Sequence, residues 1–177
     1  MKKFEGLEFL TSENEIDFYK FKPSLFKHYF MDFPKDQWPN YFSTVRHHLR
    51  MMVELIRAGY EVIYLCNSSD IVVVSKGGGK IKCSSVDDII IGPIWTCPKY
   101  RSKRYASLGI NMIINKLGYK FNYAWEFIDI NNTPSIRTVE KNNFEKVGFG
   151  RETKIFSDII LADTGTVYIY RNKGRGR

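Results

Sequence analysis

The segment 89–117 constrains the fold most, because its backbone pattern changes from strand to helix across a cluster of positive charges. An apolar run typical of a buried strand comes first and contains Ile89, Ile90, Ile91, Ile94 and Trp95. Pro98 follows this run, and after it come four cations, Lys99, Arg101, Lys103 and Arg104. Apolar side chains then recur with the spacing of one helix face, at Ala106, Ile110, Ile113 and Leu117. The segment therefore predicts a strand, a basic loop and a helix of an α/β domain.

The basic loop has the physical properties of an anion-binding site. A helix that begins directly after a loop presents backbone N–H groups and the positive end of its dipole. The four cations of the loop lie beside these groups and favour phosphate or pyrophosphate as the anion. The alternative interpretation is a basic surface loop without a ligand.

Residues 100–106, with the sequence YRSKRYA, resemble the acetyl-CoA pyrophosphate loop of the GNAT superfamily of N-acetyltransferases. In that family a strand ends in V-x-P-x-Y-R, and the loop continues as R/Q-x-x-G-x-G/A. Pro98, Tyr100, Arg101 and Ala106 match this pattern, and Thr96 stands in place of the valine. Arg104 replaces the first glycine, which lets the backbone approach the phosphates without a side chain in the way. Arg104 cannot do this, but its guanidinium would contribute a charged donor to the same anion.

A second block downstream is similar to the family pattern N-x-x-A/S…Y-E-K-x-G-F…G. It covers residues 132–144, NTPSIRTVEKNNF, and is followed by Val147 and Gly148. Asn143 replaces a glycine, which is a mild change because asparagine tolerates the left-handed conformation at a helix end. Two blocks in this order are more specific than either alone, and together they cover the central third of the chain.

The resemblance implies a mixed, mostly antiparallel sheet with a splayed strand pair and helices on both faces. It also implies acetyl-CoA as the co-substrate, with its pantetheine arm between the splayed strands and its pyrophosphate at the loop. The implied cofactor-binding residues are Ile94, Trp95, Thr96, Arg101, Ser102, Lys103, Arg104, Tyr105, Ala106, Asn131, Asn132 and Ser135. As an alternative, either asparagine caps the following helix.

The catalytic groups are harder to assign, because Val139 stands where many family members carry a tyrosine that protonates the departing thiolate. Tyr105 is the candidate donor, with Tyr100 as a second one, although both have alternative roles in the core or in the loop. Glu126 is the candidate general base, because it lies five residues before Asn131, where related enzymes often place a carboxylate. Its alternative role is an ion pair with a lysine at a strand edge.

Glu126 is expected on the same strand face as Ala124 and Ile128, whereas Tyr123, Trp125 and Phe127 occupy the other face. Partial burial there is expected to raise the pKa of its carboxyl group.

The predicted function is transfer of an acetyl group from acetyl-CoA to a primary amine of a small acceptor, and an anionic one such as a nucleotide-linked amino sugar is favoured. The alternative is a non-catalytic acyl-CoA-binding module of the same fold. Residues 18–38 are rich in aromatic residues and lysine, which indicates either an acceptor pocket or ordinary core packing with a solvated lysine face.

Composition indicates one domain over residues 1–170 and a basic, disordered tail over 171–177. The formal net charge is +8, and the four cations of the tail account for half of it. Cys66, Cys83 and Cys97 show no C-x-x-C spacing, so no metal site is predicted and a reducing cytoplasm is expected. No apolar run reaches the ~18 residues of a membrane span, and nucleic-acid motifs are lacking. The oligomeric state stays open, with a homodimer as one alternative.

Periodicity and turn residues predict the remaining elements in the order β-α-α-β-β-β-α-β-α-β-β. A short helix is expected within residues 18–30, and a second helix carries an apolar stripe at Val45, Leu49, Met52, Val53 and Ile56 before a cap at Gly59. Pro93 predicts a bulge in its strand, and Gly92 and Pro93 are the expected cause of the splay. Thr133 and Pro134 are expected to cap and begin a helix through Glu140. The other predicted strands cover residues 7–10, 61–67, 71–76, 123–130, 149–156 and 159–170, with turn residues at 163–165. The three glycines at 77–79 permit either a tight hairpin into a strand around Ile81 and Cys83 or a loop before Ile89.

Overall fold

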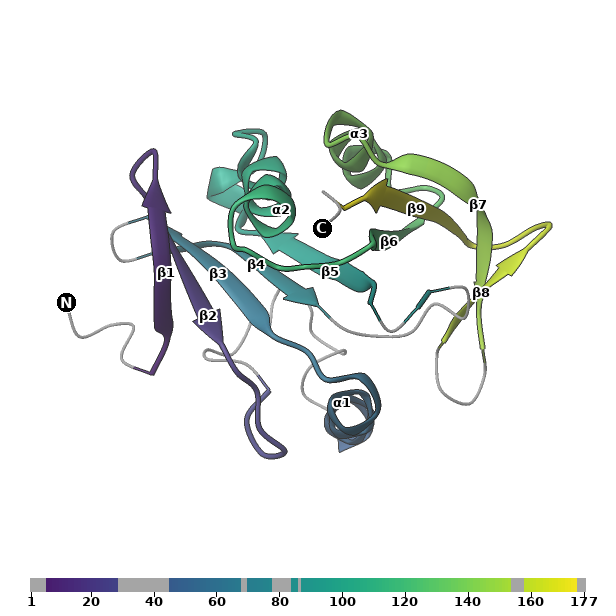
Figure 1. Ribbon diagram of the computed structural model, residues 1–177, viewed down its shortest axis with the longest axis horizontal. Coiled ribbons are helices and arrows are strands. Elements are labelled where there is room, and N and C mark those ends of the chain that lie inside the picture. Colours follow the sequence, from purple (N-terminus) through teal and green to yellow (C-terminus); the bar gives the residue numbers. More distant parts are fainter. Residues whose placement is uncertain are drawn as a thin grey trace.

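A computed structural model describes residues 6–28, 45–67, 70–77, 84–85, 87–153 and 158–174. In this part of the chain nine strands form one sheet in the order β1-β2-β3-β4-β5-β6-β9-β7-β8 (Figure 1). The strands are β1 Glu8–Glu13, β2 Ile16–Phe21, β3 Val62–Asn67, β4 Asp70–Gly77, β5 Ile89–Thr96, β6 Tyr123–Asp129, β7 Glu145–Glu152, β8 Ile159–Ala162 and β9 Val167–Lys173. The helices are α1 Val45–Ala58, α2 Tyr105–Asn115 and α3 Thr133–Lys141, with a short 3₁₀ turn, η1, at Pro98–Tyr100.

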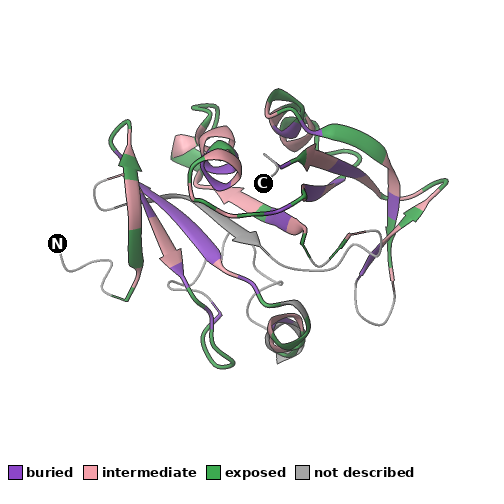
Figure 2. Ribbon diagram, viewed as in Figure 1, coloured by how far each residue is buried: buried purple, intermediate pink, exposed green. Residues whose placement is uncertain are grey.

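Helices cover both faces of the sheet, as the resemblance implied. Figure 1 shows α2 and α3 on one face and α1 on the other. On the first face Ile110 and Ile113 of α2 and Val139 of α3 pack in one buried cluster with Leu65 of β3. On the opposite face Met51 of α1 packs with apolar residues of β2 and β3. Figure 2 shows buried residues along the strands between these helices.

The predicted splayed pair is β5 and β6, the one parallel pair among the described strands. These strands are eight and seven residues long, yet their ladder contains only the pairs Ile89–Ala124 and Ile90–Trp125. Beyond these two pairs the strands are no longer hydrogen-bonded to each other, so the sheet opens towards their carboxyl ends. The predicted splay is therefore confirmed.

The predicted bulge in β5 is also confirmed. Ser75 of β4 lies opposite Ile94, whereas Gly77 lies opposite Ile91, so β5 carries one residue more than β4 in this interval. The extra length falls at Gly92 and Pro93, and Gly92 has a φ of +117°, a backbone conformation that favours glycine.

Asp88 holds the closed end of the splayed pair together. One carboxylate oxygen accepts from the backbone N–H of Tyr123 at 3.0 Å, and the other accepts from the indole N–H of Trp125 at 2.9 Å. The second oxygen also accepts from the backbone N–H of Ser85 at 2.8 Å. A single side chain just before β5 thus fixes the start of β6.

We expect Asp88→Ala to lower the free energy of unfolding by about 2–3 kcal/mol, because it leaves the buried indole N–H of Trp125 without its acceptor. Urea unfolding of the purified variants measures this loss. Asp87→Ala is the matched control, since Asp87 is exposed, and its effect should stay within about 0.5 kcal/mol. Equal unfolding midpoints for the two variants would contradict the assigned role of Asp88.

The predicted helix within residues 18–30 is wrong. Residues 16–21 form β2 instead, paired with β1 and β3, and Ile16 and Phe18 are fully buried on one face of the strand. Residues 22–28 contain no helix, and residues 29 and 30 lie outside the described part of the chain. A high density of aromatic residues and lysine does not distinguish a helix from a strand, and pairing on both sides in the sheet selects the strand. The observed order is thus β-β-α-β-β-β-α-β-α-β-β-β.

Two further expectations need correction. The predicted tail begins too early, because Arg171, Asn172 and Lys173 belong to β9; residues 175–177 lie outside the described part of the chain. Three residues of the apolar stripe that predicts α1, Leu49, Val53 and Ile56, are exposed, and the helix packs on the sheet through Met51 and Leu55 instead. The hairpin expected at 77–79 also falls mostly on residues that are not described. Across the described residues no helix has the length and apolar character to cross a membrane.

Candidate functional site

The basic loop between β5 and α2 has the backbone geometry of an open helix N-terminus. After η1, Ser102 has a φ of +61° and Arg104 a φ of +64°. Arg104 is the N-cap residue of α2, and its side chain makes no capping hydrogen bond. Because the first turn of a helix has no intrahelical acceptors for its N–H groups, the amides that follow Arg104 can serve an external anion.

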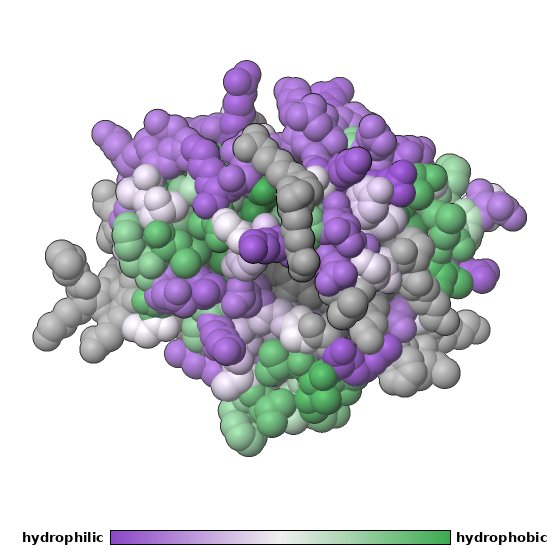
Figure 3. Space-filling view, in the orientation of Figure 1, coloured by the Kyte–Doolittle hydropathy of each residue, from purple (hydrophilic) through white to green (hydrophobic). Residues whose placement is uncertain are grey.

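Arg104 has a left-handed backbone conformation that glycine adopts more easily, at the position where the family pattern carries glycine. The substitution keeps the left-handed backbone and adds a cation. The side chains of Arg101, Ser102, Lys103 and Arg104 are all exposed. Figure 3 shows hydrophilic side chains gathered along the side of the molecule on which α2 and α3 lie.

Arg101 ties the loop to the end of β5. Its Nε donates to the backbone oxygen of Thr96 at 3.1 Å. Lys99 and Lys103 lie over the ring of Tyr100, at 5.0 and 5.6 Å from its centroid. The ring of Tyr105 meets that of Tyr100 edge to face at 6.0 Å. The structure therefore brings together the loop residues that the sequence predicts, around one tyrosine.

The remaining strand residues of the predicted cofactor site lie just before the loop. Ile94 packs with the core on the α2 side, and Trp95 packs with the core on the α1 side. Both are half-buried, as are Thr96 and Ala106. Ile94, Trp95 and Thr96 belong to the part of β5 that no longer pairs with β6.

At the start of α3 the capping alternative is correct for Asn132. Its side-chain oxygen accepts from the backbone N–H of Ser135 at 3.3 Å, so Asn132 and not Thr133 is the N-cap. Asn131 has an exposed side chain, and its backbone N–H donates to Asp129 at 2.8 Å. The cofactor contacts assigned to Asn131, Asn132 and Ser135 remain predictions.

Glu126 lies on the predicted face of β6 and is fully enclosed. It is 5 % exposed, and the described residues offer no hydrogen-bond partner to its Oε1 atom. Burial raises the pKa of its carboxyl group to about 8. No salt bridge to Glu126 is found in the part of the chain that the structure describes, so the lysine ion pair is not supported.

This raised pKa predicts a pH-dependent stability. Between pH 4.5 and about 8 the folded protein retains a proton that the unfolded chain has released, so stability falls as pH rises through this window. We expect Glu126→Gln, which does not titrate, to gain stability relative to the wild type by up to about 1.4 kcal/mol per pH unit there. Urea unfolding at several pH values measures the difference, which should level off above pH 8. A difference that does not change with pH would contradict the burial of a titrating carboxyl group.

Val139 is 1 % exposed and forms part of the core between α3 and the sheet. No proton donor therefore occupies the position at which the family resemblance places a tyrosine.

Sequence reasoning missed Tyr170, which lies opposite Glu126 in the β6–β9 ladder. Its hydroxyl donates to Glu140 at 3.1 Å, and burial raises its pKa to about 12. The alternating pattern of residues 167–170 was the available signal, but only the strand order places Tyr170 beside β6.

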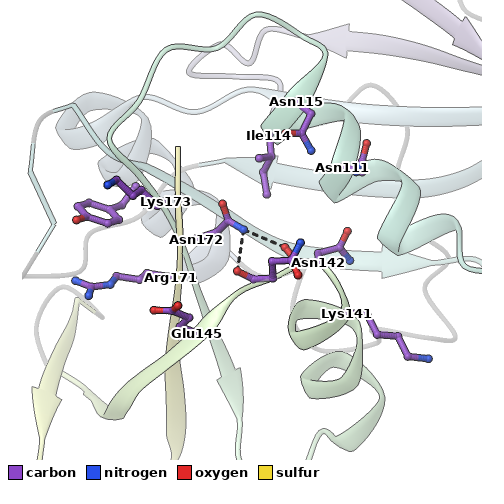
Figure 4. Close-up of a pocket in the computed structure, with 11 residues that line it drawn as sticks. Asn111, Ile114, Asn115, Lys141, Asn142, Glu145, Arg171, Asn172 and Lys173 are labelled. Atoms are coloured by element: carbon purple, nitrogen blue, oxygen red, sulfur yellow. Dashed lines mark hydrogen bonds between the residues drawn. The ribbon is translucent and has the colours of Figure 1, made fainter. Parts of the chain in front are cut away.

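A cavity of about 630 Å³ lies at the opposite end of α2 and α3 (Figure 4). Its polar wall is rich in asparagine, at positions Asn111, Asn115, Asn142, Asn143 and Asn172. Asn172 donates to the backbone oxygens of Asn142 and Asn143, and Asn142 donates to Ser107 and to the Thr138 oxygen. These bonds fasten the end of α3 to β9 and α2. None of the predicted site residues lines this cavity.

Comparison with known proteins identifies the fold. No protein-family model and no curated protein matches the sequence. Among solved structures, an aminoglycoside N(6′)-acetyltransferase from Legionella pneumophila is similar, with a TM-score of 0.54 and 11% identity over 92% of this chain and 94% of that one. An N-acetyltransferase from Staphylococcus aureus has a TM-score of 0.52 and 17% identity over 74% and 78% of the two chains.

The ribosomal-protein-alanine N-acetyltransferase from Brucella melitensis is also similar, with a TM-score of 0.51 and 13% identity over 65% of this chain and 69% of that one. The chain therefore has the GNAT fold of the N-acetyltransferases.

Proposed function

We propose that this protein transfers an acetyl group from acetyl-CoA to a primary amine. The observation that carries the proposal is the parallel pair β5–β6, which opens after two residue pairs towards the uncapped, basic N-terminus of α2. An elongated thioester with a pyrophosphate in its middle fits such an arrangement, because the strand edge and the helix end offer different kinds of hydrogen-bonding groups. The names of the similar structures agree with acetyl transfer as the reaction.

The strand edge beyond Ile90, which is not paired with β6, would offer backbone groups to the pantetheine arm, and the amides of Tyr105 and Ala106 would offer donors to the pyrophosphate. Arg101 would add charge-assisted hydrogen bonds, with its Nε already fixed to Thr96. Holding the thioester and the amine together supplies most of the catalysis that such a reaction needs. A backbone N–H near Thr96 would stabilise the charge that develops on the carbonyl oxygen.

The acceptor is proposed to be a small anionic amine, such as a nucleotide-linked amino sugar. Cations outnumber acidic residues by eight in the chain, so an anionic acceptor is attracted and a basic peptide is repelled. We expect kcat/KM for an anionic amino sugar nucleotide to exceed that for a lysine-rich peptide at least tenfold at low ionic strength. Competition assays with both acceptors measure this ratio, and faster turnover of the peptide would contradict the proposal.

The second candidate function is a non-catalytic acyl-CoA-binding module, which the buried Val139 favours because it supplies no proton to a leaving thiolate. Titration calorimetry with acetyl-CoA, followed by an assay for free thiol with a panel of amines, distinguishes the candidates. Binding together with amine-dependent thiol release supports the enzyme. Binding without thiol release supports the module, and no binding contradicts both.

A further inference from the structure

The cavity of about 630 Å³ at the ends of α2 and α3 has the size of a small-molecule site. It lies beside Tyr123, the first residue of β6, whereas the opening between β5 and β6 lies towards the other end of β6, at Asp129. Because β6 is seven residues long, about 20 Å of extended strand separates these two places. The cavity is therefore separate from the opening in which acetyl transfer is proposed.

Amide side chains from three elements meet at this cavity (Figure 4). Asn111 and Asn115 are one turn apart on α2, Asn142 and Asn143 follow the last residue of α3, and Asn172 lies on β9. Asn142 and Asn172 donate their N–H groups within the wall and hold it in place. In the described part of the chain the side chains of Asn111, Asn115 and Asn143 make no hydrogen bond, so each offers two donors and two acceptor sites to a ligand.

The cavity offers little to an apolar or aromatic ligand. Among the described residues that line it, Ile114 is the one aliphatic side chain and Tyr123 the one aromatic ring. The guanidinium of Arg171 already lies over the Tyr123 ring, 4.9 Å from its centroid, and the Trp125 ring lies 6.1 Å away. A nucleobase stacks on an open ring face. Hydroxyl groups, which both donate and accept, are the groups that the amides fit instead.

Charged side chains give the cavity an excess of positive charge. Three cations and one carboxylate line it, namely Lys141, Arg171, Lys173 and Glu145. Although Arg171 lies opposite Glu145 in the β7–β9 ladder, none of these four side chains forms a salt bridge with another described residue. The cations are therefore available to a ligand, and an anionic group is favoured.

The amides and two of the cations lie on different sides of β9. Arg171 and Lys173 alternate with Asn172 along the strand, so their side chains leave it on the opposite side (Figure 4). β7 begins opposite Arg171, so the last two residues of β9 have no partner in β7, and the cavity reaches both sides of the strand there. The negative ends of the α2 and α3 dipoles border the amide side and favour hydroxyl donors over an anion. A fitting ligand thus has hydroxyl groups at the helix ends and an anionic group at the end of β9.

We propose that this cavity binds a sugar that carries one anionic group, either a phosphate or a carboxylate. The amides of Asn111, Asn115 and Asn143 would hold the hydroxyl groups, while Arg171 and Lys173 would hold the anionic group. Sugar phosphates and sugar acids share this chemistry, and the cavity has room for either. Binding of such a sugar does not depend on the proposed acetyl transfer.

Titration calorimetry of the whole protein with glucose 6-phosphate and with glucuronic acid tests the proposal, with glucose and inorganic phosphate as the two partial ligands. We expect at least one of the anionic sugars to bind with a Kd of about 1 mM or tighter, the affinity that ligands of this size commonly reach. Glucose and phosphate should each bind at least about tenfold more weakly, because each makes only part of the contacts. If neither anionic sugar binds, or if glucose or phosphate alone binds as tightly, the proposal is wrong.

Variants on the two sides of β9 show whether the sugar occupies this cavity. Asn115→Ala removes an amide and Lys173→Gln removes a charge, and each should weaken binding of the anionic sugar by about threefold to tenfold. Asn122→Ala and Lys120→Gln are the matched controls, because both residues are exposed and neither lines the cavity. Their affinities should stay within about twofold of the wild type. Unchanged affinity in both cavity variants, with a loss in Arg101→Glu, would place the binding at the basic loop and overturn the proposal.

Discussion

Replacing Arg101 by glutamate is expected to weaken acetyl-CoA binding by roughly 10- to 150-fold. Arg101 is exposed beside the open N-terminus of α2, and its Nε is held by the Thr96 oxygen. The substitution removes one charge-assisted hydrogen bond and places a negative charge next to the pyrophosphate, with a cost of about 1.5–3 kcal/mol. Titration calorimetry at constant ionic strength measures the change in the dissociation constant.

Arg151→Glu is the matched control for this variant, because Arg151 is an exposed arginine of β7 and its replacement changes the net charge equally. We expect its affinity to stay within about threefold of the wild type. If both variants lose affinity to the same extent, the effect is one of overall charge and the loop is not the binding site.

The second large effect is expected at Gly165, in the turn between β8 and β9. A methyl group at this position would overlap the backbone carbonyl of Gly150 in β7, and backbone atoms cannot yield as a flexible side chain does. We expect Gly165→Ala to lower the free energy of unfolding by about 3 kcal/mol, the scale of a severe overpacking. Thermal or urea unfolding of the purified protein measures this loss.

Gly148→Ala provides the control on the neighbouring strand. Its methyl group would meet only the Cδ1 atom of Leu161 at 3.2 Å, and that side chain is exposed and free to move. The expected change is below about 1 kcal/mol. Similar stabilities for the two variants would contradict the close approach of the turn to β7.

The elements that carry the predicted site follow from local sequence. The β5 run, the periodic spacing in α2 and the alternation in β6 are each decided by neighbours in the chain, so periodicity predicts them correctly. The N-cap of α3 is one residue earlier than predicted, at Asn132 instead of Thr133. Both residues are good caps, and only the structure shows that Asn132 accepts from the backbone N–H of Ser135.

Long-range pairing explains what could not be predicted. Phe18 and Phe21 have a spacing that also fits a helix, and the strand β2 depends on partners on both sides. The burial of Glu126 depends on α2 and α3, which cover its face of the sheet. It also depends on the strand order, in which β9, and not β7, is the neighbour of β6. No pattern near residue 126 contains this information.

Chemical-shift mapping of backbone amides with acetyl-CoA tests the central claim most directly. We expect the amide resonances of Thr96 and of residues 101–107 to shift on titration, because they form the end of β5 and the start of α2. Resonances of Asn111, Asn115 and Asn172, which line the cavity at the opposite end of α2, should remain in place. Shifts confined to that cavity, or no shifts at saturating acetyl-CoA, would contradict the claim that the splayed strands and the basic loop bind the thioester.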